Sequence, residues 1–389
     1  MPFYNACCID MLIICGDVKL MTRESLCDTV HDVLQCYDFE GSLVTCERLG
    51  NGHINDTFLA VYDGGVCKKY TVQQINTVVF KNPDELMENI FRVTSFLAEK
   101  INKNRCDGLS ETITIVKNKN GELYTRGKNG SCWRVFTFID DAVSFDAVRN
   151  QDDFYNALYT FGTFQYLLAD FPAATLHETI CGFHDTPRRF HTFVNAVQAD
   201  ACRRVSSVKT EIDFFLAHEA DMSVYADAYA HGELPLRVTH NDAKLNNVLL
   251  DAATEKGVCV IDLDTVMPGF AGFDFGDCIR FGASTGSEDE TDLSKISFDE
   301  ALFEAGACGF IDGCRASLTA RECELLPFGA KLMTLESGMR FLTDYLEGDV
   351  YFKINKQSHN LDRCRTQIKL VQDFEQKEKS LCKIIKKII

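Results

Sequence analysis

The sequence predicts an α+β protein built of two lobes, and three observations point to that class. The first part of the chain shows patterns of strands and turns, with one helical pattern among them. After residue 139 the pattern is helical over most of the remaining chain. The length of 389 residues is enough for two domains or one large bilobal fold. We therefore expect a small antiparallel β-sheet lobe with one main helix, followed by a larger and mostly helical lobe.

The small lobe is expected to begin with three strands between residues 42 and 75. Their sequences are "SLVTCERLG", "TFLAVYD" and "VCKKYTVQQI", and Gly64 and Gly65 form a hairpin turn between the second and the third. A helix should follow at Pro83, with Asn82 as its cap. Its apolar residues recur at spacings of three and four: Leu86, Ile90, Val93, Leu97 and Ile101. Further strands, joined by Asn-Gly turns, are expected before residue 139.

These patterns set the expected domain boundaries. Residues 1–21 form an extension without an assigned role, 22–138 the small N-terminal lobe (N-lobe), 139–146 a hinge, and 147–389 the larger C-terminal lobe (C-lobe). Residues 188–220 read as a long helical region. The terminal segment "LCKIIKKII" has apolar residues with lysines between them. This pattern favours a helix packed on the C-lobe over a basic helix on a membrane surface, so no stable membrane association is expected.

Composition and charge exclude several classes of protein. The chain is 46% hydrophobic and 25% charged, as in ordinary globular proteins. Its net charge of −17 argues against a nucleic-acid binder, which needs a basic face. The 18 cysteines include no Cys-x-x-Cys pair, so zinc ribbons and redox motifs are not supported. With no clear secretory signal, we expect a cytoplasmic protein with reduced cysteines.

One short stretch, "RVTHNDAKLNNVLLD", gathers polar residues between apolar flanks. It predicts a loop between two buried strands that carries Asp242, Lys244 and Asn247. Asp262 follows in "VIDLD", and a β-hairpin between the two segments would bring it beside Asp242. Carboxylate and amide oxygens suit Mg²⁺, a further carboxylate can act as a base, and Lys244 could hold phosphoryl oxygens. The alternative interpretation is a loop whose polar residues merely cap turns.

A glycine-bearing loop lies far upstream, between two expected strands. It contains Gly50, Asn51, Gly52, His53 and Asn55. Backbone N–H groups in such a loop can approach phosphates where side chains do not interfere. Gly-x-Gly alone is a weak signal and is usually just a turn. A dinucleotide-binding motif is excluded, because that motif opens a helix and this loop opens a strand.

These residues resemble the protein-kinase-like superfamily, in its branch of aminoglycoside phosphotransferases and choline kinases. The resemblance is closer still to N-acetylhexosamine 1-kinases and extends from about residue 42 to residue 375. The matching stretches are "GNGHINDTF", "QQINTVVFKNPDELMENI", "THNDAKLNNVLLD", "VIDLDTVMPGFAGFDFGDCIRFG", "TLESGMRFLTDYLEGDVYFKI" and "NLDRCRTQIKL". The resemblance implies a bilobal protein-kinase-like fold.

The resemblance also implies an activity: phosphorylation of the anomeric hydroxyl of N-acetylglucosamine or N-acetylgalactosamine, with ATP as co-substrate and Mg²⁺. Asp242 would be the catalytic base, and Asn247 and Asp262 would bind the metal. The glycine loop would cover the phosphates. Gln73 would belong to the nucleotide site. The connecting segment around Phe138–Asp140, which includes Ile139, would hold adenine through backbone groups.

The sugar contacts implied by the resemblance are Arg340, Asp344 and Tyr351. The alternative for the first two is an i,i+4 ion pair on a solvated helix face. A literal "DFG" occurs at Asp274, but the resemblance places the metal ligand at Asp262. Asp274 and Asp277 would then brace the catalytic loop or cap the helix that begins there. Asp264 could assist at the metal site.

The third strand departs from the protein-kinase pattern. Protein kinases place a lysine there, which pairs with a helix glutamate, whereas this chain has Gln73 and Gln74. The closer sugar kinases share the absence, so activity is not contradicted. The partner of Glu88 (or Glu85) stays open.

Two other functions remain open. One is a kinase for choline or an aminoglycoside, whose cationic acceptor needs a strongly acidic or aromatic pocket. Arg340 suits a neutral polyol better, because a guanidinium donates several hydrogen bonds. The other is a nucleotide-binding pseudokinase scaffold, against which the intact Asp242, Asn247 and Asp262 argue.

Overall fold

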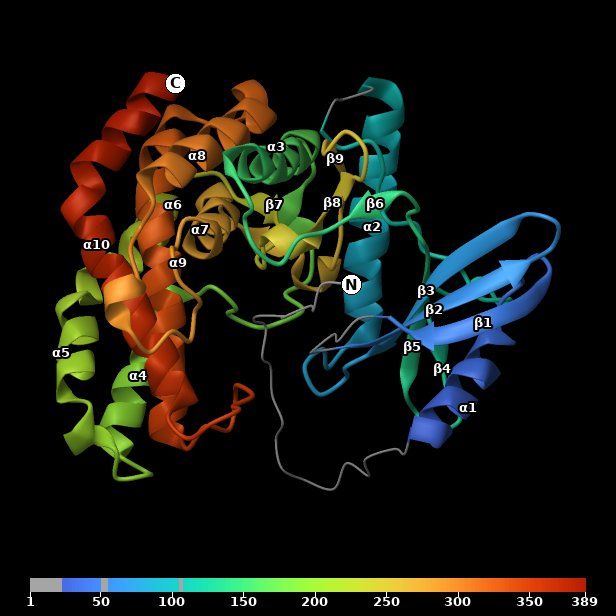
Figure 1. Ribbon diagram of the computed structural model, residues 1–389, viewed down its shortest axis with the longest axis horizontal. Coiled ribbons are helices and arrows are strands. Elements are labelled where there is room, and N and C mark those ends of the chain that lie inside the picture. The colour runs from blue at the N-terminus through green and yellow to red at the C-terminus, as the bar shows by residue number, and fades with distance from the viewer. Residues whose placement is uncertain (1–22, 50–54, 105–107) are drawn as a thin grey trace.

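A computed structural model shows two lobes, with the N-lobe sheet standing apart from a larger helical body (Figure 1). The structure describes residues 23–49, 55–104 and 108–389. Five antiparallel strands form the N-lobe sheet in the order β1-β2-β3-β5-β4. Their bounds are β1 Ser42–Arg48, β2 Asp56–Asp63, β3 Cys67–Ile75, β4 Thr125–Arg126 and β5 Cys132–Thr137. The α+β class and the three first strands are thus confirmed.

Two helices accompany this sheet, where the sequence indicated one. Helix α1, Arg23–Leu34, was not predicted; its residues Val30 and Val33 are buried with Phe58 and Trp133 of the sheet. The predicted helix is α2, Pro83–Asn104, and its cap is Asn82, whose side chain accepts from the Glu85 backbone N–H. Seen in Figure 1, α2 lies between the sheet and the C-lobe.

The periodic apolar residues of α2 belong to the main core of the molecule. Leu86, Ile90, Val93 and Leu97 are at most 1% exposed, and they share that core with C-lobe residues such as Phe164. Burial of this face therefore attaches α2 to the C-lobe as well as to the sheet. The N-lobe helix is consequently a fixed link between the two lobes.

The C-lobe is mostly helical, as expected. Its helices are α3 Gln151–Leu167, α4 Thr186–Ala199, α5 Lys209–Ala217, α6 Val224–Ala230, α7 Ala271–Gly282, α8 Glu300–Cys314, α9 Ala320–Glu347 and α10 His359–Ile388. The helical region predicted over 188–220 is divided into α4 and α5. The division occurs because Asp200 adopts a left-handed conformation (φ 39°) at the end of α4 and accepts from the Val205 backbone N–H.

Two small sheets carry the polar segments of the C-lobe. In one, β8 (Val248–Asp251) and β9 (Gly257–Val260) form the antiparallel hairpin that the sequence predicted, with β6 (Ala142–Val143) beside it. In the other, β7 (Arg237–Thr239) pairs with β10 (Met267–Gly269). The polar loop connects β7 to β8 and therefore lies between the two sheets.

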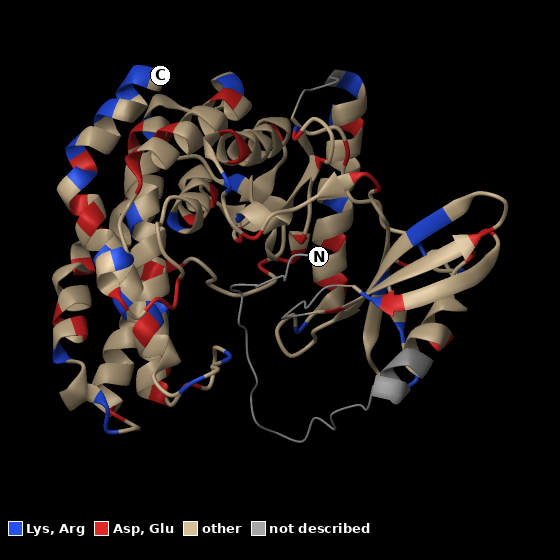
Figure 2. Ribbon diagram, in the orientation of Figure 1, with Lys and Arg blue, Asp and Glu red and all other residues tan. Residues whose placement is uncertain are grey.

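The C-terminal helix packs on the C-lobe, as favoured from the sequence. Leu381 and Ile385 of α10 are at most 2% exposed, and α10 lies against α8 and α9. Figure 2 shows acidic as well as basic residues along its length. Among the residues that the structure describes, no helix combines the length and the apolar character needed to cross a membrane.

Candidate active site

The loop between β7 and β8 is held by one buried carboxylate on α7. Asp274 accepts from the backbone N–H groups of His240 (2.9 Å) and Asn241 (2.8 Å). Gln165 of α3 donates to the same carboxylate at 2.6 Å. Asp274 thus braces the loop, as expected, but it does not cap α7, because the cap position is Phe270.

A second set of bonds ties this loop to the segment that follows β9. His240 is fully buried, and its Nε2 lies 2.9 Å from the carbonyl oxygen of Ile261. Thr265 Oγ1 donates to the carbonyl of His240 at 2.7 Å, and the Asn241 side chain donates to the carbonyl of Thr265 at 2.9 Å. Asp242 and Asp262, one on each segment, are therefore held in a fixed relation.

Asp242 has the surroundings expected of a general base. The Asn247 amide nitrogen donates to its backbone carbonyl (2.9 Å) and to its Oδ2 (3.2 Å), and Lys244 Nζ lies 3.0 Å from Oδ2. Burial raises the pKa of Asp242 to about 6; Lys244 opposes this shift, whereas Asp277 and Asp262 add to it. A base with a pKa just below neutral is largely deprotonated at pH 7 and still basic enough to accept a proton.

Asp262 follows β9 and stands in a left-handed conformation (φ 59°, ψ 55°). Its side chain is exposed to solvent, yet the surrounding protein atoms and then Asp264 raise its pKa, while Lys244 opposes the shift. Lys244 balances part of the negative charge of Asp242 and Asp262, and a divalent cation would neutralise the rest. The Asp262 carboxylate and the Asn247 amide offer the hard oxygen atoms that Mg²⁺ prefers, so these two residues fit the metal.

The structure describes only part of the predicted nucleotide site. Gly50, Asn51, Gly52 and His53 are outside the described residues. The backbone N–H of Phe138 donates to the carbonyl of Lys69 at 3.1 Å, and that N–H is therefore already used. Contacts between the nucleotide and the hinge, which includes the buried Ile139, remain a prediction.

The two other nucleotide candidates have bonds within the protein. Asn55 donates to Asp264 Oδ2 at 2.7 Å and accepts from the Asn76 backbone N–H at 3.0 Å. Gln73 donates to Thr57 Oγ1 at 3.1 Å and accepts from Arg134 Nε at 3.0 Å. The side chains of Asn55 and Gln73 are thus hydrogen-bonded to other protein groups of the described structure.

A cavity opens beside Asp242 in the C-lobe. Residues from four separate parts of the chain line it: Phe183, His184, Asn241, Asp242, Asp277, Arg280, Glu288, Met333, Ser337, Arg340, Phe341 and Phe352. Because the candidate base is one of the lining residues, a small molecule in this cavity could present a hydroxyl to it.

Arg340 is the predicted acceptor contact that faces this cavity. Its side chain is 14% exposed, and Nη2 donates to the Tyr351 hydroxyl at 3.2 Å. Its guanidinium lies 5.6 Å from the Phe183 ring centre and 5.5 Å from that of Phe352. The buried Nε makes no hydrogen bond in the structure. Arg340 Nη1 lies 3.8 Å from the buried Glu336 carboxylate, so the alternative of a solvated ion pair with Asp344 is wrong.

Asp344 holds the segment that carries Tyr351. Its carboxylate accepts from the backbone N–H groups of Val350, Tyr351 and Phe352 at 2.9, 2.7 and 2.9 Å, and from the side chain of Asn360 at 2.8 Å. It is 2% exposed and is not among the cavity-lining residues. The structure thus gives Asp344 a supporting position next to the predicted contact.

His184 is a cavity residue that sequence reasoning missed. Its Nδ1 lies 2.9 Å from Glu336 Oε1, and its Nε2 lies 3.0 Å from the carbonyl oxygen of Asn241. Both partners are acceptors, so the ring is best satisfied as a cation. Burial alone would lower the pKa of His184, but Glu336 and the Asn241 carbonyl raise it overall. No periodicity or motif in "CGFHD" marks this residue.

Asp277 and Arg280 form another unexpected part of the cavity wall. Arg280 donates to Asp277 at 2.9 Å and to Glu288 at 2.7 Å. Asp277 therefore binds Arg280, and the structure shows no bond from it to the catalytic loop, in contrast to the expectation.

Glu88, whose partner was open, lies 3.0 Å from His177 Nε2 on the C-lobe.

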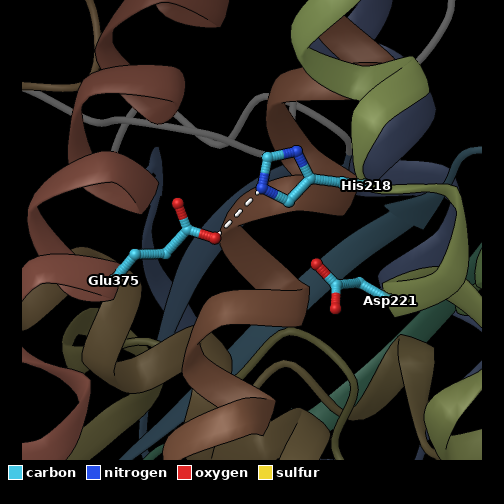
Figure 3. A group of neighbouring side chains, drawn as sticks. All are labelled: His218, Asp221 and Glu375. Atoms are coloured by element: carbon cyan, nitrogen blue, oxygen red, sulfur yellow. Dashed lines mark hydrogen bonds and ion pairs between the residues drawn. The ribbon is translucent and has the colours of Figure 1, made fainter.

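A second cluster of His and acidic residues lies away from this cavity, on the face formed by α5, α9 and α10. His218, Asp221 and Glu375 point toward one another there (Figure 3). Lys331 Nζ lies 2.8 Å from Asp221 and 2.9 Å from Glu375. A lysine ammonium thus already supplies the positive charge that a metal ion would bring.

The family match and the fold together define a phosphotransferase with a kinase-like fold. Residues 45–307 match the phosphotransferase enzyme family, and since this span exceeds half of the chain, the chain belongs to that family. A microcompartment-associated aminopropanol kinase has a similar structure (TM-score 0.60, 16% identity, covering 91% of this chain and 98% of the other). So does an aminoglycoside phosphotransferase from Alicyclobacillus acidocaldarius (TM-score 0.60, 12% identity, 96% and 98%).

A third similar structure is an amicoumacin kinase in complex with AMP-PNP and Ca²⁺ (TM-score 0.55, 10% identity, covering 92% of this chain and 94% of the other). At these identities the likeness shows the fold. The predicted kinase-like fold is thus confirmed.

Proposed function

We propose that this protein transfers the γ-phosphoryl group of ATP to the anomeric hydroxyl of an N-acetylhexosamine, giving the sugar 1-phosphate. The observation that carries the proposal is that Asp242 and Arg340 line one cavity. The former can accept the proton of a hydroxyl, and the latter can donate to sugar oxygens.

The charges around the cavity favour a neutral acceptor. Three acidic residues line it (Asp242, Asp277 and Glu288), and so do three basic ones (Arg280, Arg340 and His184). Arg280 is bound to both Asp277 and Glu288, so these carboxylates are not available as counter-ions for a cation. A neutral molecule with many hydroxyl groups can bind such mixed donors and acceptors without burying a further charge.

The aromatic rings also argue against a quaternary ammonium acceptor. Phe183 and Phe352 could form an aromatic cage for a cation, which is the observation that favours a choline kinase. The Arg340 guanidinium, however, already lies over both rings, within 5.6 Å of their centres. A second cation would be repelled by it, so we place the choline-type and aminoglycoside-type acceptors second.

In the proposed reaction the acceptor hydroxyl lies beside Asp242, which accepts its proton as the new O–P bond forms. The bond between the γ-phosphorus and the bridging oxygen of ADP breaks in the same step. Lys244, next to Asp242, can hold a phosphoryl oxygen. Asn247 and Asp262 would hold Mg²⁺, which when bound neutralises charge on the phosphates. His240 and Asp274 keep these groups in place.

A coupled ADP-release assay across a panel of acceptors tests the proposal. The panel contains N-acetylglucosamine, N-acetylgalactosamine, their methyl glycosides, choline, ethanolamine and an aminoglycoside. We expect turnover with the free sugars and none with the methyl glycosides, which match them except for the blocked anomeric hydroxyl. A higher kcat/KM for choline or the aminoglycoside would refute the sugar assignment. Absence of turnover with every acceptor, together with nucleotide binding, would support a pseudokinase.

A further inference from the structure

Three polar side chains of the N-lobe meet at the segment that follows Asp262. Asp264 is 3% exposed, and it binds Arg134 Nη1 through Oδ1 and Asn55 Nδ2 through Oδ2. Asn89 of α2, 1% exposed, donates to the carbonyl of Val266 at 3.1 Å. We call these five residues the inter-lobe clamp. It joins β5, α2 and the residue before β2 in the N-lobe to one short C-lobe turn.

Arg134 is the charged member on the N-lobe side. It lies on β5 directly opposite Gln73 of β3, and its side chain is 2% exposed. Its Nε donates to Gln73, and its guanidinium lies 5.1 Å from the Phe136 ring centre. A buried guanidinium needs a carboxylate partner, and Asp264 supplies it. The pair therefore fixes the distance between the sheet and the turn after Asp262.

Helix α2 makes its connection through Asn89 and not through its neighbouring acid. Glu88 is 53% exposed and interacts with His177 and Arg92. Asn89 instead donates to the carbonyls of His177 (2.8 Å) and Val266 and accepts from the His177 N–H (3.0 Å). The N-lobe thus reaches the Asp262 turn through an arginine on a strand and an asparagine on a helix.

The turn itself needs such support. Asp262 has a φ of 59°, a left-handed conformation that non-glycine residues adopt at some cost and keep when the surroundings enforce it. Asp264 and Val266 follow within the same turn, and both are fixed by the clamp. Release of either would let the backbone at Asp262 relax and turn its carboxylate away from Asp242.

We propose that Arg134 is a positioning residue for metal binding: through Asp264 it holds Asp262 in the conformation that binds the metal of the metal–nucleotide complex. Arg134 acts here without touching the substrate. The inference rests on the proposed metal-binding role of Asp262, but it is independent of which acceptor the enzyme uses. It gives the N-lobe sheet a direct influence on the metal site.

Calorimetric binding of AMP-PNP without any acceptor tests this, with Mg²⁺ and again with EDTA. In the Arg134→Gln variant, and in the nearly isosteric Asp264→Asn variant, we expect the Mg²⁺-dependent gain in affinity to fall by about tenfold or more, as for other residues that orient metal ligands. Affinity in EDTA should stay within a few-fold of wild type. Arg134→Lys, which keeps the charge, should recover part of the gain.

Two controls make the outcomes distinguishable. Lys100→Gln removes a more exposed ion pair between α2 and Asp170 of the C-lobe, with the same change of charge, and should bind as wild type does. Asp262→Ala sets the value expected for complete loss of the metal ligand. Fluorescence of Trp133, the single tryptophan, reports whether each variant is folded around β5. If the Arg134→Gln variant does not fold, the Asp264→Asn variant is used for the test.

Each result decides a different point. If Asp262→Ala keeps its Mg²⁺-dependent gain, the proposed metal site is wrong. If Asp262→Ala loses the gain but the folded Arg134 and Asp264 variants keep it, the positioning role is overturned. If the Arg134 variant also loses affinity in EDTA, Arg134 contacts the nucleotide itself, which overturns the inference as well.

Discussion

The proposed catalytic loop and the proposed acceptor cavity are built in opposite ways. The loop takes Asp242, Lys244 and Asn247 from one short stretch, and a single carboxylate, Asp274, braces it. The cavity takes its residues from segments as far apart as Phe183 and Phe352. A compact motif makes the chemistry recognisable and constrains it strongly. The dispersed wall, by contrast, forms only when distant segments of the chain pack together.

The largest difference between the two regions should appear on substitution of the base. Asp242→Asn should lower kcat by about 10²–10⁴-fold, because it removes the proton acceptor and retains the size of the side chain. Calorimetry with AMP-PNP should show nucleotide binding close to that of wild type. A decrease of only a few-fold in kcat, with normal nucleotide affinity, would show that another group is the base.

Loss of the brace should affect stability more than any cavity substitution. Asp274→Ala leaves the N–H groups of His240 and Asn241 and the Gln165 amide without their buried acceptor, at about 1–3 kcal/mol for each such group. Urea denaturation measures the decrease in the free energy of unfolding. Asp292→Ala removes an exposed carboxylate that accepts from the Ser294 N–H and serves as the control. Equal losses in both variants would contradict the bracing role.

A cavity substitution should separate the acceptor from the nucleotide. Arg340→Ala should raise the KM for the sugar by roughly 10- to 100-fold, because hydrogen bonds from a charged donor are worth about 1.5–3 kcal/mol. The KM for ATP should stay nearly constant. Arg321→Ala, an exposed arginine on the same helix, is the matched control. If the KM for ATP rises and that for the sugar does not, the cavity does not bind the acceptor.

The smallest expected effect is a pH dependence that originates in the cavity wall. The pKa of His184 is raised in the folded protein, so its stabilising effect is complete below the unfolded pKa of about 6.5 and disappears as the pH rises through the folded value. His184→Gln should therefore destabilise the protein more at pH 6 than at pH 9, as measured by urea denaturation. A difference that stays constant with pH would mean that His184 is neutral.

The elements that the sequence predicted correctly are those with local patterns. Helix α2 has its apolar residues at regular spacing and Pro83 at its start, and the β8–β9 hairpin joins two short apolar runs. The choice of Asp262 over Asp274 as the metal ligand came from the resemblance to kinases and stays a prediction. The hairpin does bring the Asp262 segment beside the loop, where the Ile261 N–H donates to the Asn247 carbonyl. The sequence did not predict helix α1, because its few apolar residues are explained only by their burial against the sheet.

By itself, the sequence determined the α+β bilobal class, the main N-lobe helix and the catalytic loop with its candidate base. In the helix and in the loop, the residues concerned lie within a few turns or one hairpin of each other. Their spacing in the sequence therefore shows that they share a helix face or a loop. Only the tertiary structure decided that His184 and Arg280 line the acceptor cavity, that Asp344 supports Tyr351, and that Arg134 meets Asp264. Those contacts join residues far apart in the chain, and their energies depend on burial and on exact pairing of charges, which arise only when the lobes and helices have packed.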